Sequence, residues 1–354
     1  MSLLQVPGNK PPKLDWIQVE VTSCCDGDCI YCPRHVYKKQ WKNRQMPLDK
    51  FRSLKPAFKK TDLVHLQGWG EPLLHPEIME MLKIVKDCRA KVGTTTNANR
   101  LNPSMAESLV MSGLNIIGFS LAGISAEKND SIRKGTSLDS VIKAIENLQK
   151  AKEKLQSAYP DIHVAYMLLN SNLDELENMP EFFARLKVDQ VVVSSLSLVC
   201  SPELKNESVL AETELQWEEL IKRVEKVQED AVRKGVDMHF QLVSPLAWPK
   251  PCGENVARAL VVDAGGEVSP CVLANVPVTA GCTYYFGQEE IEFPKSSFGN
   301  TFEKPLGRIW RNPDFRRFRK RHLRGDLPSI CQKCYKSRVV TKSPEYRMPA
   351  DGLV

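Results

Sequence analysis

No stretch of this 354-residue sequence approaches the run of roughly 20 apolar residues that a membrane-spanning helix needs. The first fourteen residues contain Pro7, Pro11 and Pro12 and lack the apolar centre of a secretory signal peptide. Internal repeats and low-complexity tracts are absent as well. We therefore expect a cytoplasmic protein without a membrane partner. The 42% apolar and 26% charged residues are typical of an ordinary globular chain.

A large excess of charge is also missing. The formal net charge is +6 and is spread along the chain, so it does not by itself indicate a nucleic-acid partner. One local run could grip RNA phosphates: Arg316, Arg317, Arg319, Lys320, Arg321 and Arg324. Few aromatic residues that could stack on bases are interleaved with it. The run is better interpreted as a solvated helix face beside an anionic thiolate site, and a nucleic-acid partner is not expected.

Cysteine, by contrast, is abundant. The chain has eleven cysteines, an odd number that fits poorly with a simple disulfide framework. Because thiols stay reduced in the cytoplasm, the cysteines are predicted to be metal ligands rather than disulfide partners.

Short β-rich runs alternate with helical patterns along the first 200 residues. The clearest helical pattern places Leu138, Val141, Ile142, Ile145 and Leu148 on one face. Six runs read as strands: residues 17–21, 63–66, 92–96, 116–121, 164–168 and 191–193. This alternation predicts an α/β fold of parallel βαβ units, an open partial (βα)6 barrel. Residues that carry chemistry should then follow the carboxyl ends of these strands.

The texture of the sequence changes after a long polar helical pattern. Proline and glycine break up the segments beyond it, and cysteines become denser. We predict a barrel over residues 12–211, a connecting helix over 212–234, a small loop-rich domain over 235–342 and a tail over 343–354.

Three cysteines lie on one loop directly after the first strand. Cys25, Cys29 and Cys32 form a C-x3-C-x2-C triplet. Thiolates are the natural ligands of iron–sulfur clusters, and three of them around a four-iron cubane leave one iron open. The alternative is a structural zinc site with His35 as the fourth ligand. Cys24 is not expected to be a ligand, because it would lengthen the first gap.

This triplet resembles the signature of the radical S-adenosylmethionine (SAM) superfamily, C-x3-C-x-aromatic-C, with Tyr31 in the aromatic position. The resemblance covers roughly residues 14–200. It implies a [4Fe–4S] cluster on Cys25, Cys29 and Cys32 that binds SAM and cleaves it reductively, so that a 5′-deoxyadenosyl radical abstracts hydrogen from a substrate. It also implies a reduced ferredoxin or flavodoxin as the electron donor.

The resemblance extends to residues after later strands. In the superfamily a Gly-Gly-Glu-Pro-like motif holds the amino group of the methionine, while a polar residue faces the ribose and an arginine pairs with the carboxylate. The matching positions are Gly68, Gly70, Glu71 and Pro72, then Thr96 and Asn97, then Ser120 for the ribose, Arg133 for the carboxylate, and Asn172. Each also has a plain structural interpretation as a cap, turn or surface residue.

A second set of cysteines lies in the loop-rich segment: Cys252, Cys271, Cys331 and Cys334. Their spacing resembles the auxiliary-cluster extension called SPASM or, in its shortened form, twitch. No cysteine follows Cys334, so we predict one auxiliary cluster, of the [4Fe–4S] type. A zinc site remains the alternative. Cys282 is either a replacement ligand or a small buried residue.

These features together predict a radical SAM enzyme that acts on a peptide or protein, or on a small cofactor precursor. An RNA-modifying radical SAM enzyme is one alternative. A non-catalytic zinc protein that binds nucleic acid is an alternative of a different class.

Overall fold

A computed structural model describes residues 13–279, 281–293 and 295–343. In this part of the chain the strands form one ten-stranded sheet and one two-stranded hairpin. The sheet order is β12-β7-β6-β5-β4-β3-β2-β1-β8-β9. Its strands are β1 (Leu14–Val19), β2 (Thr61–Leu66), β3 (Lys91–Thr96), β4 (Ile116–Leu121), β5 (Asp161–Leu168), β6 (Gln190–Ser195), β7 (Met238–Val243), β8 (Ala259–Val262), β9 (Val268–Ser269) and β12 (Val339–Lys342).

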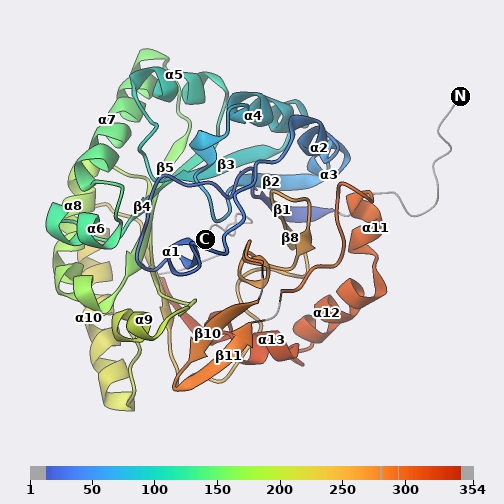
Figure 1. The fold of residues 1–354 in the computed structure, drawn as a ribbon. Helices are drawn as coiled ribbons and strands as arrows, with labels where there is room; N and C mark the ends of the chain where they lie inside the picture. The colour runs from blue at the N-terminus through green and yellow to red at the C-terminus, as the bar shows by residue number, and fades with distance from the viewer. Residues whose placement is uncertain (1–12, 280, 294, 344–354) are drawn as a thin grey trace, which may run out of the picture.

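The helices pack around this curved sheet (Figure 1). They are α1 (Pro33–Val36), α2 (Leu48–Arg52), α3 (Lys55–Phe58), α4 (Ile78–Asp87), α5 (Pro103–Met111), α6 (Ala126–Ile132), α7 (Leu138–Lys154), α8 (Met179–Leu186), α9 (Pro202–Glu207), α10 (Glu214–Arg233), α11 (Leu306–Trp310), α12 (Pro313–Leu323) and α13 (Ser329–Gln332). Segments of 3-10 helix cover Pro72–Leu74, Asn170–Asn178, Leu273–Asn275 and Tyr335–Arg338. None of the described helices has the length and apolar character needed to cross a membrane.

The six predicted strands are present as β1–β6 and pair side by side in chain order, all parallel. The predicted number of strands was too low, however. β7 pairs parallel with β6 at one end of the series, and β8 pairs parallel with β1 at the other. β8 was missed because it is a four-residue run with every side chain buried, which has no alternation to reveal a strand.

Beyond the predicted boundary at residue 235 the chain continues the main sheet. β7, β8, β9 and β12 all come from the segment assigned to a separate domain, yet they extend the main sheet. The expected connecting helix is α10, and it packs against α8 and β7 rather than bridging two bodies. Thr213 begins it with a capping box, accepting a hydrogen bond from the Gln216 backbone at 3.2 Å. The division into two domains stays a prediction.

C-terminal elements cover the side of the sheet that α2–α10 leave open (Figure 1). They include α11–α13 and the antiparallel hairpin of β10 (Cys282–Phe286) and β11 (Glu289–Phe293). Of the predicted tail, Ser343 is the last described residue, and 344–354 lie outside the described residues. The first residue of the predicted barrel, Pro12, lies outside them as well.

Candidate functional site

The cysteine triplet lies on the loop between β1 and α1. All three thiols are half-buried, and Pro33 begins α1 directly after Cys32. They line a cavity with about 1360 Å³ of empty space, part of which is open to solvent. Side chains at or just beyond the carboxyl ends of β1–β7 form much of the rest of its wall, and C-terminal residues such as Leu273 and Lys336 add to it. This is the edge of the sheet at which the sequence predicted the chemistry.

The electrostatics of the triplet suit a bound metal cluster. Burial raises the pKa of the Cys25 thiol to about 11 and that of Cys32 to about 12, so positive metal is needed for these groups to be thiolates at neutral pH. The Gly27 backbone N–H donates to Cys25 Sγ at 3.3 Å. His35, the fourth ligand of the zinc alternative, lies instead against Asp28, with Nδ1 3.1 Å from Oδ1.

Glu71, which follows β2, forms hydrogen bonds with the end of β3 beside the triplet. Its carboxylate accepts hydrogen bonds from the Thr96 hydroxyl at 2.8 Å, the Asn97 backbone N–H at 2.7 Å and the Leu73 backbone N–H at 3.1 Å. The Asn97 amide then donates to Asp26 Oδ1 at 2.7 Å, within the cysteine loop. Burial raises the pKa of Glu71 to about 7, although these hydrogen bonds oppose the shift. Glu71 therefore positions the loops around the triplet.

The two glycines of the motif are required by close packing. A Cβ on Gly70 would lie 2.3 Å from the Thr22 carbonyl oxygen and 2.6 Å from that of Cys24. A Cβ on Gly68 would lie 2.3 Å from Cγ of Glu20, a buried carboxylate that accepts the Trp69 backbone N–H at 2.7 Å. Both glycines line the cavity, but their lack of a side chain serves the loop before Cys25 as much as any ligand.

Arg133 lies at the cavity wall and is 4% exposed. One of its terminal nitrogens donates to the Tyr31 hydroxyl. Burial opposes the charge of Arg133, yet the neighbouring Tyr31 and Cys29 raise its pKa, so it stays a cation. Its Nε–H is buried and has no partner among the described residues. A buried, unfilled donor of this kind suits a carboxylate ligand.

Most of the predicted cofactor contacts line the cavity, but two do not. The eight that line the cavity are Tyr31, Gly68, Gly70, Glu71, Thr96, Asn97, Ser120 and Arg133. Pro72 is not part of the wall and begins a 3-10 turn. Asn172 is fully buried outside the wall, where its amide donates to the carbonyls of Ala122 and Met167 and accepts from the Leu169 backbone N–H. These bonds occupy its amide and link three backbone groups, so they favour a structural role for Asn172; the predicted cofactor contact stays a prediction.

The cavity wall also contains neutral polar residues that the sequence interpretation missed: Gln18, Gln67, Thr95, Ser194 and Gln241. Thr95 donates to Gln67 Oε1 at 3.2 Å, and Gln18 donates to the Gln67 carbonyl at 3.1 Å. All lie on or directly after strands. A polar residue near the end of an otherwise apolar strand was the signal that could have revealed them.

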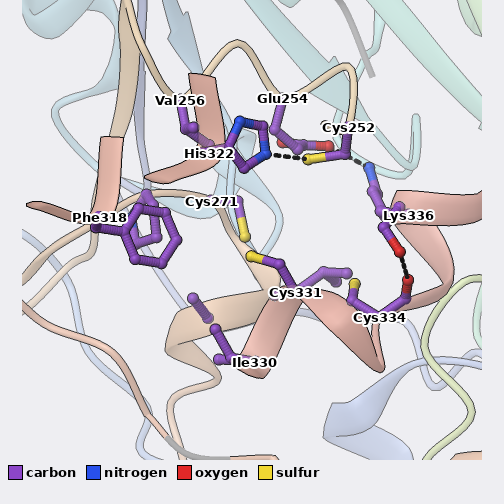
Figure 2. Close-up of a pocket in the computed structure, with 14 residues that line it drawn as sticks. Cys252, Glu254, Val256, Cys271, Phe318, His322, Ile330, Cys331, Cys334 and Lys336 are labelled. Atoms are coloured by element: carbon purple, nitrogen blue, oxygen red, sulfur yellow. Dashed lines mark hydrogen bonds and ion pairs between the residues drawn. The ribbon is translucent and has the colours of Figure 1, made fainter. Parts of the chain in front are cut away.

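The second set of cysteines meets at another pocket, which has about 460 Å³ of empty space including a part open to solvent. Cys252, Cys271, Cys331 and Cys334 come from three separate segments, and Figure 2 shows their sulfurs arranged around one space. Cys282, whose role was open, is buried in β10 and does not line this pocket. It is a packing residue in the hairpin. In the described part of the chain no three His, Cys, Asp or Glu side chains converge as ligands of a single ion would.

The second pocket is as strongly buried as the first. Burial raises the pKa of Cys252 and of Cys331 to about 12, and it also raises the pKa of Cys271 and Cys334. His322 Nε2 lies 3.6 Å from Cys252 Sγ (Figure 2). Four thiols around one pocket, with the His322 imidazole and the Lys336–Glu254 ion pair beside them, suit an iron–sulfur cluster.

The two spaces share part of their walls. Leu273 and Lys336 line both, and Lys336 forms an ion pair with Glu254 beside the second pocket. A group held by the four cysteines would therefore lie next to the main cavity.

Residues 19–183 match the family model of the radical SAM superfamily, and residues 252–335 match that of the SPASM iron–sulfur cluster-binding domain. The chain belongs to the radical SAM superfamily. It is a radical SAM enzyme with a C-terminal SPASM domain, as the resemblance of its motifs implied. Its cofactors are accordingly a [4Fe–4S] cluster, SAM and auxiliary iron–sulfur chemistry in the SPASM domain.

Similar proteins include the tungsten-containing aldehyde ferredoxin oxidoreductase cofactor-modifying protein of Pyrococcus furiosus. It is 25% identical over 86% of this chain and 83% of that protein. The AdoMet-dependent heme synthase of Methanosarcina barkeri is 23% identical over 94% and 90%. The fold is similar to that of Streptococcus suis SuiB bound to S-adenosylmethionine, with a TM-score of 0.62, 16% identity and coverage of 86% of this chain and 67% of that one. SuiB has also been solved with its precursor peptide SuiA.

Proposed function

We propose that this enzyme matures a peptide or a small cofactor precursor by hydrogen abstraction in the cavity between the two cysteine sites. The [4Fe–4S] cluster on Cys25, Cys29 and Cys32 supplies the reductive cleavage of SAM. The observation that carries the proposal is the shared wall: Lys336 and Leu273 border both spaces, so a substrate in the cavity would lie beside the auxiliary cluster.

The residues of the chain would hold and orient SAM. Arg133 presents an unfilled donor for its carboxylate. Glu71 holds the loops after β2 and β3 at fixed positions, so that backbone groups of the turn at Gly68 and Gly70 can receive the amino group. Ser120 lines the same cavity and is proposed to face the ribose. These contacts would orient the 5′ carbon of SAM toward the substrate and exclude water. Binding and orientation are the protein's part, because the cofactor supplies the difficult chemistry.

The neutral part of the cavity wall supports a substrate that is recognised through hydrogen bonds. Gln18, Gln67, Ser194 and Gln241 offer amide and hydroxyl groups but no charge. Peptide groups and the polar edges of a cofactor precursor both suit such a wall. The similar proteins that match this chain over most of its length are named for cofactor modification and heme synthesis, which supports the cofactor class. A reduced ferredoxin or flavodoxin is proposed as the electron donor.

Metal analysis and product formation test this proposal together. After anaerobic reconstitution we expect about eight irons per chain and 5′-deoxyadenosine formation from SAM with a strong chemical reductant. The triple variant Cys25→Ala, Cys29→Ala and Cys32→Ala should lose about half of the iron and all 5′-deoxyadenosine. Cys24→Ala is the matched control, because Cys24 lies in the same loop outside the cavity wall and should leave both quantities unchanged. Product formation by the triple variant, or bound zinc in place of iron, would refute the assignment.

A further inference from the structure

The outward side of α12 carries a stripe of cations. Residues 316, 317, 320, 321 and 324 repeat at helical spacing, and their side chains border one hollow in the surface. All five are arginine or lysine. Arg317 pairs with Asp314, and Arg321 pairs with Asp326. In the described part of the chain no carboxylate pairs with the other three cations of the stripe: Arg316, Lys320 and Arg324.

The opposite side of the same helix is fixed to the protein core. Phe315 stacks on Phe298, with ring centroids 4.3 Å apart. The Arg319 guanidinium lies 3.7 Å from the Trp310 ring centroid and donates to the Trp310 carbonyl at 2.8 Å. The stripe is therefore presented on a rigid support, which lowers the entropy lost when a partner binds.

The inner side of α12 also borders the auxiliary site. Phe318 and His322 line the pocket of the four cysteines, and His322 lies against Cys252. An α-helix with its side chains is about 10–12 Å across. A partner on the cationic side would thus be separated from the auxiliary cluster by the thickness of one helix.

The loop between α12 and α13 also connects the cationic stripe to the auxiliary site. Arg321 donates to the Leu327 carbonyl at 3.2 Å, and Gln332 donates to the same carbonyl at 2.9 Å. α13, which contains Cys331, has no fully buried residue. Cys331 itself is only half-buried. Cys331 is therefore a partly exposed residue of the auxiliary site on the segment that Arg321 contacts through the Leu327 carbonyl.

We infer that the stripe on α12 is the docking surface for an acidic one-electron carrier protein that reduces the auxiliary cluster. This inference rests on the proposed function. In the docked complex the carrier is oxidised by one electron and the cluster held by the four cysteines is reduced by one, with no transfer of a proton or a group. Opposite charges bring the two proteins together, because electrostatic steering raises association rates.

The test compares two charge-reversal variants of the reconstituted enzyme. The first is Arg316→Glu, Lys320→Glu, Arg324→Glu. The control makes the same change in net charge at exposed lysines of α7 and α10, Lys150→Glu, Lys222→Glu, Lys226→Glu, which lie on the other side of the molecule (Figure 1). The oxidation of a reduced acidic flavodoxin is followed by its flavin absorbance. Separately, 5′-deoxyadenosine formation is measured with a small deazaflavin photoreductant that needs no docking surface.

We expect the α12 variant to oxidise the flavodoxin about 10-fold or more slowly than wild type at low salt, and the control to change little. The difference should vanish near 1 M salt, where the screening length is about 3 Å. Deazaflavin-driven product formation should stay at the wild-type level in both variants. Equal flavodoxin rates in the two variants would overturn the docking surface.

Two further outcomes are informative. Failure of the wild-type enzyme to form 5′-deoxyadenosine with deazaflavin would refute the proposed function instead of the docking surface. RNA is the rival ligand for a cationic stripe. If a short single-stranded RNA binds the wild-type enzyme and not the α12 variant, while flavodoxin oxidation is unchanged, the stripe is an RNA surface and the inference is overturned.

Discussion

A single methyl group at Gly70 should disable the SAM cluster without unfolding the sheet. In Gly70→Ala the new Cβ would lie 2.3 Å from the Thr22 carbonyl oxygen, whereas real Cβ contacts are essentially never shorter than 3.0 Å. The difference, 3.0 minus 2.3, requires a shift of at least 0.7 Å. The obstructing atoms are backbone atoms of residues 22–24, so the shift must move the loop that leads into Cys25.

The size of the effect follows from what that loop does. Overpacking of this kind costs about 1–3 kcal/mol of stability, which a large core can tolerate. A displacement of the order of 1 Å at a reacting group, however, can cost about 100-fold in rate. We therefore expect Gly70→Ala to lose up to about half of the iron and at least about 100-fold in 5′-deoxyadenosine formation, with a nearly unchanged circular dichroism spectrum.

The matched control is Gly253→Ala, next to the auxiliary ligand Cys252. Apart from Gly253 itself and its two neighbours in the chain, no residue has an atom within 4 Å of the new Cβ, so this variant should keep the iron content and the activity of wild type. Iron and 5′-deoxyadenosine are measured on both variants after identical reconstitution. If Gly70→Ala retains full iron and full activity, the argument that this glycine sets the position of the cluster loop is wrong.

Three other predictions address separate features. Asn172→Ala should lower the free energy of unfolding by roughly 3 kcal/mol in urea denaturation, because three buried backbone groups lose their hydrogen bonds. The Kd for SAM should stay the same. Weaker SAM binding without a loss of stability would support Asn172 as a cofactor contact instead. Burial raises the pKa of Glu20 to about 7, whereas the ordinary pKa of a glutamate is 4.5. Between pH 4.5 and 7 the folded state therefore loses up to roughly 3 kcal/mol of stability as Glu20 ionises. In Glu20→Gln the unfolding midpoint should fall less over this pH range than in wild type, and an unchanged pH profile would contradict the prediction. His322→Phe should make the midpoint potential of the auxiliary cluster more negative in a redox titration, because the hydrogen-bond donor beside Cys252 is lost. His322→Gln should recover part of this shift, and the potential of the SAM cluster should not change in either variant.

Much of the site could be predicted because its residues are close in sequence or lie at strand ends. Cys25, Cys29 and Cys32 occupy one loop, so their spacing together with the position after the first strand predicts a site with three thiolate ligands. Glu71 was placed by its motif after a strand and Arg133 by the resemblance to the family, and both line the cavity. The reason for Gly70 was only partly visible, since the carbonyls that exclude a side chain belong to another loop.

The features that could be predicted from the residues alone are local: the alternation that makes β1–β6, the cysteine spacings and the family they indicate. The tertiary structure decided which elements share the sheet, and it brought β7 and β8 into it from a segment that looked separate. It also turned Asn172 inward to backbone groups and set the cationic side of α12 across one helix from the auxiliary cysteines. The reason is physical: hydrogen bonding within a segment follows from adjacent residues, whereas strand pairing and burial depend on partners that are distant in the chain.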